Sequence, residues 1–274
     1  MLAPSLADPH RESWAKGSIA YLQGDYDAAL RLLRPLAEDG YPEAQSMLGV
    51  IYSEGRAAPQ DHAEAVSWYL RAAKQGHAPS QFTVGAYYEN GRGVPQDYAK
   101  AISWYRKAAE QGHAASQYQL GRHYAGSGIV AKDYAEAHKW LNLAAAKEHT
   151  RAQVLLGLMY DRGFGVPQDF SKAVSWFRLA ATAGDGDGQH MLGAMYWAGH
   201  GVPQDYVMAH MWSNLAAAQA VKDAERARDK IARLMTPAQV AKAQELASEW
   251  RPKTLDFDDL LEAFKRGATQ KGDP

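Results

Sequence analysis

The chain has 274 residues, 46% of them hydrophobic and 22% charged, which is a globular composition and excludes a disordered or collagen-like chain. Its 30 Lys and Arg nearly balance its 31 Asp and Glu, so it lacks the basic excess that binding to nucleic acid requires. With no cysteine, it can form no disulfide, thiol nucleophile or cysteine-bound zinc site.

The N-terminal sequence does not have the form of a signal peptide. Residues 1–8 contain no Lys or Arg ahead of an apolar core. No run of about 18 apolar residues follows, so we expect no membrane insertion. The sequence as written predicts a soluble cytoplasmic protein, or a periplasmic or secreted one if Met1 replaces a removed signal. The compartment therefore stays open.

Residues 12–40 predict a shorter helix pair that caps the N-terminal end of the chain. The segment Gly24 to Leu30 keeps only the last part of a corner that recurs later in the sequence. End units of a helical repeat protein are atypical because one of their faces meets solvent instead of a neighbour. We therefore assign residues 1–41 to a capping helix pair of the tetratricopeptide type.

A unit of 36 residues then recurs five times without a slip. The glycines of this unit are Gly49, Gly85, Gly121, Gly157 and Gly193, and its tryptophans are Trp68, Trp104, Trp140, Trp176 and Trp212. The copies span residues 42–221, as 42–77, 78–113, 114–149, 150–185 and 186–221. Glycine and tryptophan columns that never vary between copies indicate positions that the packing of the unit demands.

Each copy predicts two amphipathic helices, which we name helix A and helix B. In the first copy, apolar residues recur at helical spacing over residues 44–54 and again over 61–75. Gly49 lies in the middle of helix A, where glycine costs about 1 kcal/mol relative to alanine. We expect another helix backbone to approach closely there, and Ala72 and Ala73 to serve the same approach.

A corner of the form Gly-x-Gly-Val-Pro-Gln-Asp separates helix A from helix B. It stands at residues 91–97, 163–169 and 199–205. Glycine favours a left-handed helix end, proline stops the helix, and aspartate accepts the first backbone N–H groups of helix B. We also expect Glu64 and Glu136 to complete capping boxes with Asp61 and Asp133.

The third copy departs from this corner. Its glycines are displaced to Gly126 and Gly128, and it has no proline there. We therefore expect altered geometry or a specialised contact at this corner.

The C-terminal region predicts two further capping helices over residues 222–252. Thr236, Pro237 and Gln239 provide an N-cap, a proline at the first helical position and a capping-box partner. Residues 253–274 predict a short amphipathic segment and a disordered tail. Its apolar residues are Phe257, Leu260, Leu261 and Phe264.

This pattern closely resembles the Sel-one-like repeat family, a relative of the tetratricopeptide repeats. The second copy carries it most fully, at Gln81, Gly85, Tyr88, Gly91, Gly93, Val94, Pro95, Gln96, Asp97, Tyr98, Ala101, Trp104, Tyr105, Ala108, Ala109 and Gly112. The resemblance implies an all-α fold, a right-handed α-α solenoid of stacked antiparallel helix pairs. It also implies an adaptor that holds other proteins, often in bacterial signalling, envelope regulation or host contact.

Catalytic and metal motifs are weak. Ser13 and Lys16 match the Ser-x-x-Lys of penicillin-recognising enzymes, but the companion motifs are missing. The Gly-x-Gly corners follow a helix, whereas phosphate loops follow a strand. His77, His113 and His149 share a column, yet column mates in stacked helices lie about 10 Å apart, too far for one zinc ion. We expect no enzyme, no metal and no cofactor.

The variable positions of helix A are the candidate binding residues, because packing leaves them free to meet a partner. In related helical-repeat folds helix A lines the concave face. Aromatic residues and arginine dominate interface hot spots. The candidates for a concave binding groove are Phe82, Tyr118, Arg122, His190 and Trp197. The alternative for Phe82 and Tyr118 is that they fill gaps between helices.

The sequence therefore predicts a non-enzymatic scaffold or adaptor for a protein or peptide, whose identity stays unknown. Its first rival is an envelope enzyme or β-lactam binder that uses Ser13 and Lys16. The second is self-association through the C-terminal segment of residues 253–274, which can alternatively dock onto the last repeat. We expect a monomer.

Overall fold

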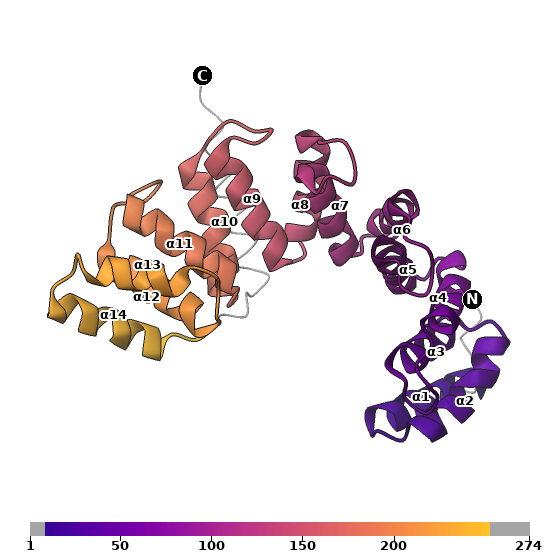
Figure 1. Cartoon of the computed structure of the whole chain (residues 1–274). Helices are drawn as coiled ribbons and strands as arrows, with labels where there is room; N and C mark the ends of the chain where they lie inside the picture. Colours follow the sequence, from indigo (N-terminus) through magenta and orange to yellow (C-terminus); the bar gives the residue numbers. More distant parts are fainter. Residues whose placement is uncertain (1–8, 253–274) are drawn as a thin grey trace, which may run out of the picture. The chain divides into compact units, whose positions relative to one another are not determined.

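The computed structural model describes residues 9–252, and these fold into fourteen α-helices without a strand (Figure 1). The all-α solenoid class is thereby confirmed. The helices are α1 (Pro9–Leu22), α2 (Tyr26–Glu38), α3 (Pro42–Glu54), α4 (His62–Lys74), α5 (Ala78–Asn90), α6 (Tyr98–Glu110), α7 (Ala114–Gly126), α8 (Tyr134–Ala145), α9 (Thr150–Arg162), α10 (Phe170–Thr182), α11 (Gly186–Ala198), α12 (Tyr206–Ala218), α13 (Ala224–Ala232) and α14 (Pro237–Glu249).

The chain divides into two compact units between Lys132 and Asp133. Unit 1 holds α1–α7 and unit 2 holds α8–α14, so the division falls in the corner of the third repeat. At that corner α7 ends at Gly126, and its cap Ser127 is right-handed. The corresponding caps of the other four repeats are left-handed glycines. The predicted change of geometry in the third corner is therefore confirmed.

The regular corners cap both of the helices that they join. Gly55 and Gly91 end helix A with φ of +72° and +65°, a conformation that only glycine adopts at little cost. Asp61 begins helix B by accepting hydrogen bonds from the N–H groups of Ala63 and Glu64, both at 2.9 Å. These local bonds explain why the corner sequence recurs so strictly.

The predicted capping boxes at Asp61 and Asp133 are wrong. The carboxylate of Glu64 instead accepts a hydrogen bond from the indole of Trp68 at 2.8 Å. Glu136 binds the indole of Trp140 in the same way at 2.9 Å. A tryptophan one helical turn later competes for the carboxylate, and it provides a buried N–H donor that needs a partner. The box at Thr236 and Gln239 is present as predicted.

The second glycine of the corner lets neighbouring repeats approach at their backbones. A Cβ built at Gly93 would lie 2.2 Å from the carbonyl oxygen of His62, at the start of the preceding helix B. At Gly201 it would lie 2.4 Å from the backbone of Phe170. Any side chain here would force the two repeats apart.

The glycine in the middle of helix A lies against a bulky side chain of helix B in the same repeat. Built Cβ atoms would fall 2.7 Å from the ring of Tyr69 at Gly49, 2.7 Å from Tyr105 at Gly85 and 2.4 Å from Phe177 at Gly157. The prediction that a helix backbone fills this space is therefore wrong for these repeats. The space holds a ring, because Tyr and Phe reach across the helix pair where a bare backbone would leave a void.

In four of the five repeats, a buried glutamine of helix A links the repeat to the helix B before it. Gln81 donates to the carbonyl of Ala73 at 3.0 Å and accepts from Gln111 at 2.7 Å. Gln45 makes the equivalent bonds to Ala37 and Gln75 at 3.0 and 2.8 Å. These glutamines thus satisfy a carbonyl at the end of the preceding helix B, which would otherwise be buried without a partner. The fourth repeat differs, because the buried side-chain amide of Gln153 has no hydrogen-bond partner among the described residues.

Helix pairs stand at both ends of the repeats. The prediction of a shorter helix pair at the N-terminal end is wrong for the helices, since α1 and α2 have 14 and 13 residues, against 13 in α3. Only the corner between α1 and α2 is short. At the C-terminal end α13 and α14 pack on α12, where Trp250 meets Trp212 edge-on with ring centroids 6.0 Å apart. The predicted amphipathic segment with Phe257, Leu260, Leu261 and Phe264 lies outside the described residues.

Burial lowers the pKa of six histidines below the ordinary value of 6.5. They are His77, His123, His138, His149, His190 and His210. At His210, Arg228 adds to this downward shift and Asp229 opposes it. The Nδ1 atom of His210 is buried and has no hydrogen-bond partner among the described residues. A folded pKa below the unfolded one means that the unfolded chain takes up protons first as the pH falls.

We expect Gly157→Ala to destabilise the fold by about 1–3 kcal/mol more than Gly193→Ala. The two glycines occupy the same repeat position and gain the same helix propensity. The new Cβ would meet the Phe177 ring at 2.4 Å in one case, and in the other the Ser213 hydroxyl at 3.0 Å and the backbone oxygen of Ala209 at 3.1 Å. Urea unfolding of both variants measures the difference, and equal losses would contradict the ring-packing account.

We expect His210→Val to raise the unfolding free energy at pH 5.5 by about 1 kcal/mol or more, because it removes a buried, unpartnered ring nitrogen. Val66 and Val174 occupy this position in the first and fourth repeats, so valine fits the fold. The wild-type chain should lose stability as the pH falls below about 6.5, and the variant should lose less. Urea titrations at pH 7.5 and 5.5 test this, and parallel losses would contradict it.

Candidate functional site

The predicted binding residues lie along one face of helix A. Positions 4, 8 and 11 residues into each repeat stand one helical turn apart, so their side chains share a face. We call this surface the helix-A face. Phe82, Tyr118 and Arg122 belong to it in unit 1, and His190 and Trp197 belong to it in unit 2. All five side chains are partly buried.

Phe82 contributes to packing inside unit 1. Its ring lies 5.7 Å from the ring of Tyr105 and 5.2 Å from that of His113, measured between centroids. Tyr105 belongs to helix B of the same repeat, and His113 caps the helix A that follows. The alternative that Phe82 fills a gap between helices therefore has direct support, although part of its ring stays accessible.

Arg122 is held by an ion pair within unit 1. Its guanidinium lies 2.8 Å from Glu89, whose carboxylate also accepts a hydrogen bond from the hydroxyl of Tyr105 at 2.6 Å. Burial raises the pKa of Glu89, but the bonds from Tyr105 and Arg122 outweigh it, so the net shift is downward. The imidazole of His123 lies 3.5 Å from the same carboxylate, and burial lowers the pKa of this histidine. Arg122 therefore anchors its own repeat, and a partner would compete with Glu89 for it.

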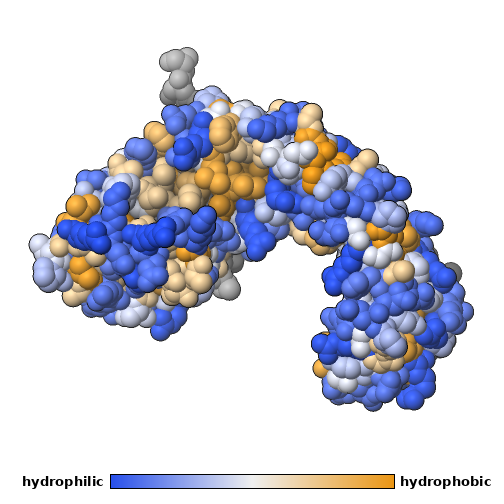
Figure 2. Space-filling view, in the orientation of Figure 1, coloured by the Kyte–Doolittle hydropathy of each residue, from blue (hydrophilic) through white to orange (hydrophobic). Residues whose placement is uncertain are grey.

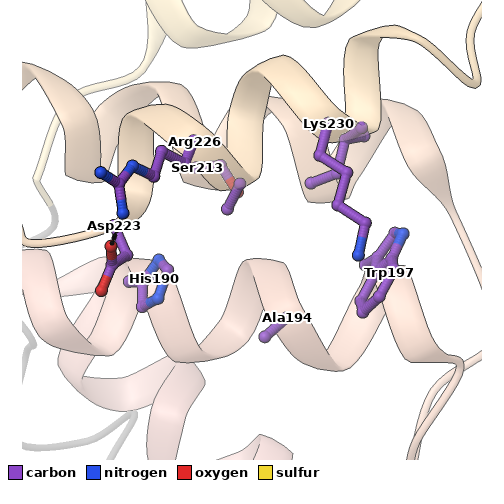
Figure 3. A pocket seen from close by; sticks show the side chains of 9 residues that line it. His190, Ala194, Trp197, Ser213, Asp223, Arg226 and Lys230 are labelled. Atoms are coloured by element: carbon purple, nitrogen blue, oxygen red, sulfur yellow. Dashed lines mark hydrogen bonds and ion pairs between the residues drawn. The ribbon is translucent and has the colours of Figure 1, made fainter.

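In unit 2 the helix-A face opens into a pocket of about 350 Å³, which we call the fifth-repeat pocket (Figure 3). His190, Ala194 and Trp197 line one wall along α11. The opposite wall comes from α13, and one polar side chain, that of Ser213, enters from α12. Pockets of this size and mixed lining are typical of ligand sites. The structure thus brings two of the predicted residues, His190 and Trp197, into one site.

Charged side chains of α13 stand along this pocket. The ammonium of Lys230 lies 4.5 Å from the centroid of the Trp197 ring, over its face (Figure 3). Towards the other end Arg226 pairs with Asp223 at 3.3 Å. Burial lowers the pKa of His190, and the charges of Asp187 and Asp223 oppose that shift. The net charge of the lining cations and the one aspartate is positive.

The sequence-based prediction missed Ser213, which lines the pocket. The corresponding positions in the other repeats hold Tyr69, Tyr105, Leu141 and Phe177, all bulky. Gly193 itself is covered, since a Cβ built there would lie 3.0 Å from the Ser213 hydroxyl and 3.1 Å from the backbone oxygen of Ala209, so the predicted close approach of a helix backbone holds in this repeat. A comparison of this helix-B column between the copies could have revealed the exception, because Ser213 alone breaks it.

The competing sites gain little from the structure. Lys16 pairs with Glu12 at 2.7 Å on an exposed surface of α1, so its ammonium is already engaged with a carboxylate. The corner glycines that resemble a phosphate loop are used for backbone contact between repeats, as at Gly93 and Gly201. His77, His113 and His149 are the N-caps of three successive helices A. Within residues 9–252 no cluster of three histidines or carboxylates stands ready for a metal ion.

Hydrophilic residues cover most of the surface in view, and apolar patches interrupt it (Figure 2). The large exposed apolar side chains are scattered over different helices and corners, among them Leu22, Leu143 and Phe164. None of the helices in the described part of the chain has both the length and the apolar character needed to cross a bilayer.

The comparisons with known proteins agree on one family. The Sel1 repeat model matches residues 42–77, 78–113, 114–149, 150–185 and 186–221, about two thirds of the chain. A solved Sel1 repeat protein from Oxalobacter formigenes is 31% identical, with a TM-score of 0.77 over 89% of this chain and 98% of that one. A search of curated proteins found no match.

Two other bacterial structures are similar at lower TM-scores. A protective antigen of uropathogenic Escherichia coli with an SLR fold is 26% identical, with a TM-score of 0.43 over 97% of this chain and 72% of that one. An immunity protein from Pseudomonas aeruginosa is 18% identical, with a TM-score of 0.46 over 81% and 86%. Repeat solenoids of this kind are generally non-catalytic scaffolds for protein interactions. With five matched repeats in register, the chain belongs to the Sel1 repeat family.

Proposed function

We propose that this chain is a non-enzymatic adaptor that binds a protein or peptide through the helix-A face, in bacterial signalling or at the cell envelope. The observation that carries the proposal is the fifth-repeat pocket, where the helix-A face opens between α11 and α13. The bacterial origin of the related Oxalobacter formigenes protein supports the setting.

The packing of the helices supports the choice of this face. In unit 2, α9 and α11 are the helices A of adjacent repeats, and they touch each other directly. A layer in which neighbouring helices touch forms a continuous surface that a peptide can follow across repeats. Because both helices are fixed by core residues such as Leu156 and Leu192, that surface is organised before a partner arrives.

The five candidate residues differ in what they can offer a partner. Trp197 and His190 line an open pocket, so a ligand could bury them further. Phe82 already packs on two rings of unit 1, and Arg122 already pairs with Glu89. We therefore assign the main binding role to Trp197 and His190 in unit 2. Tyr118 stays a candidate in unit 1 because of its position on the helix-A face.

We expect Trp197→Ala to change the unfolding free energy by no more than about 1 kcal/mol, since it removes a partly exposed ring and one cation–π contact. Trp212→Ala is the matched control. It truncates the buried tryptophan of the same repeat and should cost about 3–5 kcal/mol. Thermal and urea unfolding measure both changes. A large loss from Trp197→Ala would show that this ring belongs to the core.

We expect the double variant Trp197→Ala, Tyr118→Ala to lose a partner that the wild-type chain captures from a lysate of the source organism. Quantitative mass spectrometry of the captured proteins measures the loss. Leu143→Ala is the control, because Leu143 is exposed on helix B and lies off the helix-A face. Capture that survives the double variant would contradict the proposed binding face.

A further inference from the structure

The fifth-repeat pocket occupies a space that other repeats fill with their own side chain. In the first, second and fourth repeats an aromatic ring of helix B lies on the helix-A glycine, with closest approaches of 2.4 to 2.7 Å to a built Cβ. The fifth repeat keeps the glycine, Gly193, but Ser213 stands where the ring would begin. In the second repeat that ring, Tyr105, lies against Phe82 and Glu89, whose positions correspond to those of His190 and Trp197 in the fifth repeat. The fifth-repeat pocket thus lies where a ring packs in the second repeat, whereas Gly193 itself is covered by Ser213 and the backbone of Ala209.

The lining of the pocket suits an aromatic group. Trp197 presents a ring to it, and Ala194 and Ile231 provide small and branched apolar contacts. A phenyl ring that enters would bury apolar area against these side chains, and ring pairs gain about 0.5–1.5 kcal/mol beyond that burial.

The charges at the pocket indicate which group of a ligand should lie next to the ring. Arg226 is engaged with Asp223 at 3.3 Å. Lys230, in contrast, has no ion-pair partner among residues 9–252, and its ammonium rests on the Trp197 ring. A cation beside an apolar pocket attracts a carboxylate, and a ligand carboxylate would give Lys230 the partner that α13 does not provide.

We propose that the fifth-repeat pocket binds an aromatic side chain of a partner peptide, and that an acidic residue next to it pairs with Lys230. This inference rests on the proposed function, because the pocket is part of the helix-A face. It deepens that function by giving the chemistry of the partner: a ring in the pocket lined by Ser213 and Trp197, and a carboxylate at Lys230.

The chain itself contains one segment of similar chemistry. Phe257 stands between Asp256 and Asp258, outside the described residues. We assign the pocket to a partner because Trp197 and His190 continue the face proposed for partner binding. The chain's own segment is the competing occupant that the experiment must separate.

The test is a titration of the full-length chain, with its tryptophans labelled with ¹⁵N, by the peptide N-acetyl-Asp-Phe-Asp-amide. We expect it to shift the indole resonance of Trp197, which is assigned from Trp197→Phe. N-acetyl-Asp-Ala-Asp-amide should bind at least tenfold more weakly, because it lacks the ring. N-acetyl-Asn-Phe-Asn-amide should also bind more weakly, and Lys230→Met should remove most of the difference between this peptide and its acidic counterpart. Equal binding of all three peptides would overturn the proposal.

Substitutions at Ser213 connect the binding to the pocket. Ser213→Phe should fill it as Phe177 fills the fourth repeat, weakening the acidic peptide at least tenfold while the melting temperature stays level or rises. Ser213→Leu should also fill the pocket and weaken binding of the acidic peptide, since Leu141 occupies this position in the third repeat. It replaces Ser213→Phe in the test if the phenylalanine variant fails to fold. Ser213→Ala keeps the pocket open and should bind normally. Unchanged binding in a folded Ser213→Phe or Ser213→Leu variant would overturn the proposal.

Two further outcomes separate the occupants and the hypotheses. If Phe257→Ala raises the affinity for the acidic peptide tenfold or more, the pocket belongs to the chain's own segment and the assignment to a partner is overturned. Unchanged affinity supports the partner.

If Ser213→Phe captures the partner as well as wild type while the Trp197, Tyr118 double variant loses it, only the pocket proposal fails. If the double variant also retains the partner, the helix-A face itself is wrong.

Discussion

The contact between the helix-A glycine and the bulky side chain of helix B sets the geometry on which the repeats depend. Because the glycine has no side chain, a ring such as Phe177 can lie flat on the helix backbone, with a built Cβ at only 2.4 Å. This holds the two helices of a pair close together and fills the space between them without a void. The pair then presents its outer surfaces to the neighbouring repeats as one rigid body. The buried glutamines and the second glycines of the corners then join one helix pair to the next.

Hydrogen bonding supplies the register between repeats. In the first, second and fifth repeats a buried glutamine, such as Gln81, bridges a carbonyl at the end of the preceding helix B and the amide of a glutamine at the end of its own repeat. A glutamine suits this place because it carries both a donor and an acceptor. Where these bonds form, polar groups inside the stack are paired at positions that repeat with the helices. Buried side-chain atoms without a partner among the described residues occur at varying positions, such as Nδ1 of His210, and also in the shared columns, at Gln117, Gln153 and Trp212.

The corner of the third repeat and the pocket of the fifth repeat occur where a repeat departs from the shared sequence pattern. The third repeat has a different corner, and the chain divides into its two units there. The fifth repeat keeps Gly193 but replaces the bulky residue by Ser213, and a pocket opens between α11 and α13. The fifth repeat loses van der Waals contacts at this position, because Ser213 does not fill the space that a bulky side chain fills in the other repeats. A ligand that fills the space would recover that packing.

The sequence by itself determined the period of the repeat, the two helices in each copy, their caps and the family. These follow from local rules, namely amphipathic periodicity, the left-handed preference of glycine and the capping power of aspartate. Only the tertiary structure decided which groups meet. It placed a ring on Gly157, turned Glu64 to the indole of Trp68, and tied Arg122 to Glu89. Periodicity assigns a side chain to a face of its helix, but its neighbour depends on how far helices stand apart and how they cross. For the same reason the pocket beside Ser213 became visible only when α13 was in place to form its other wall.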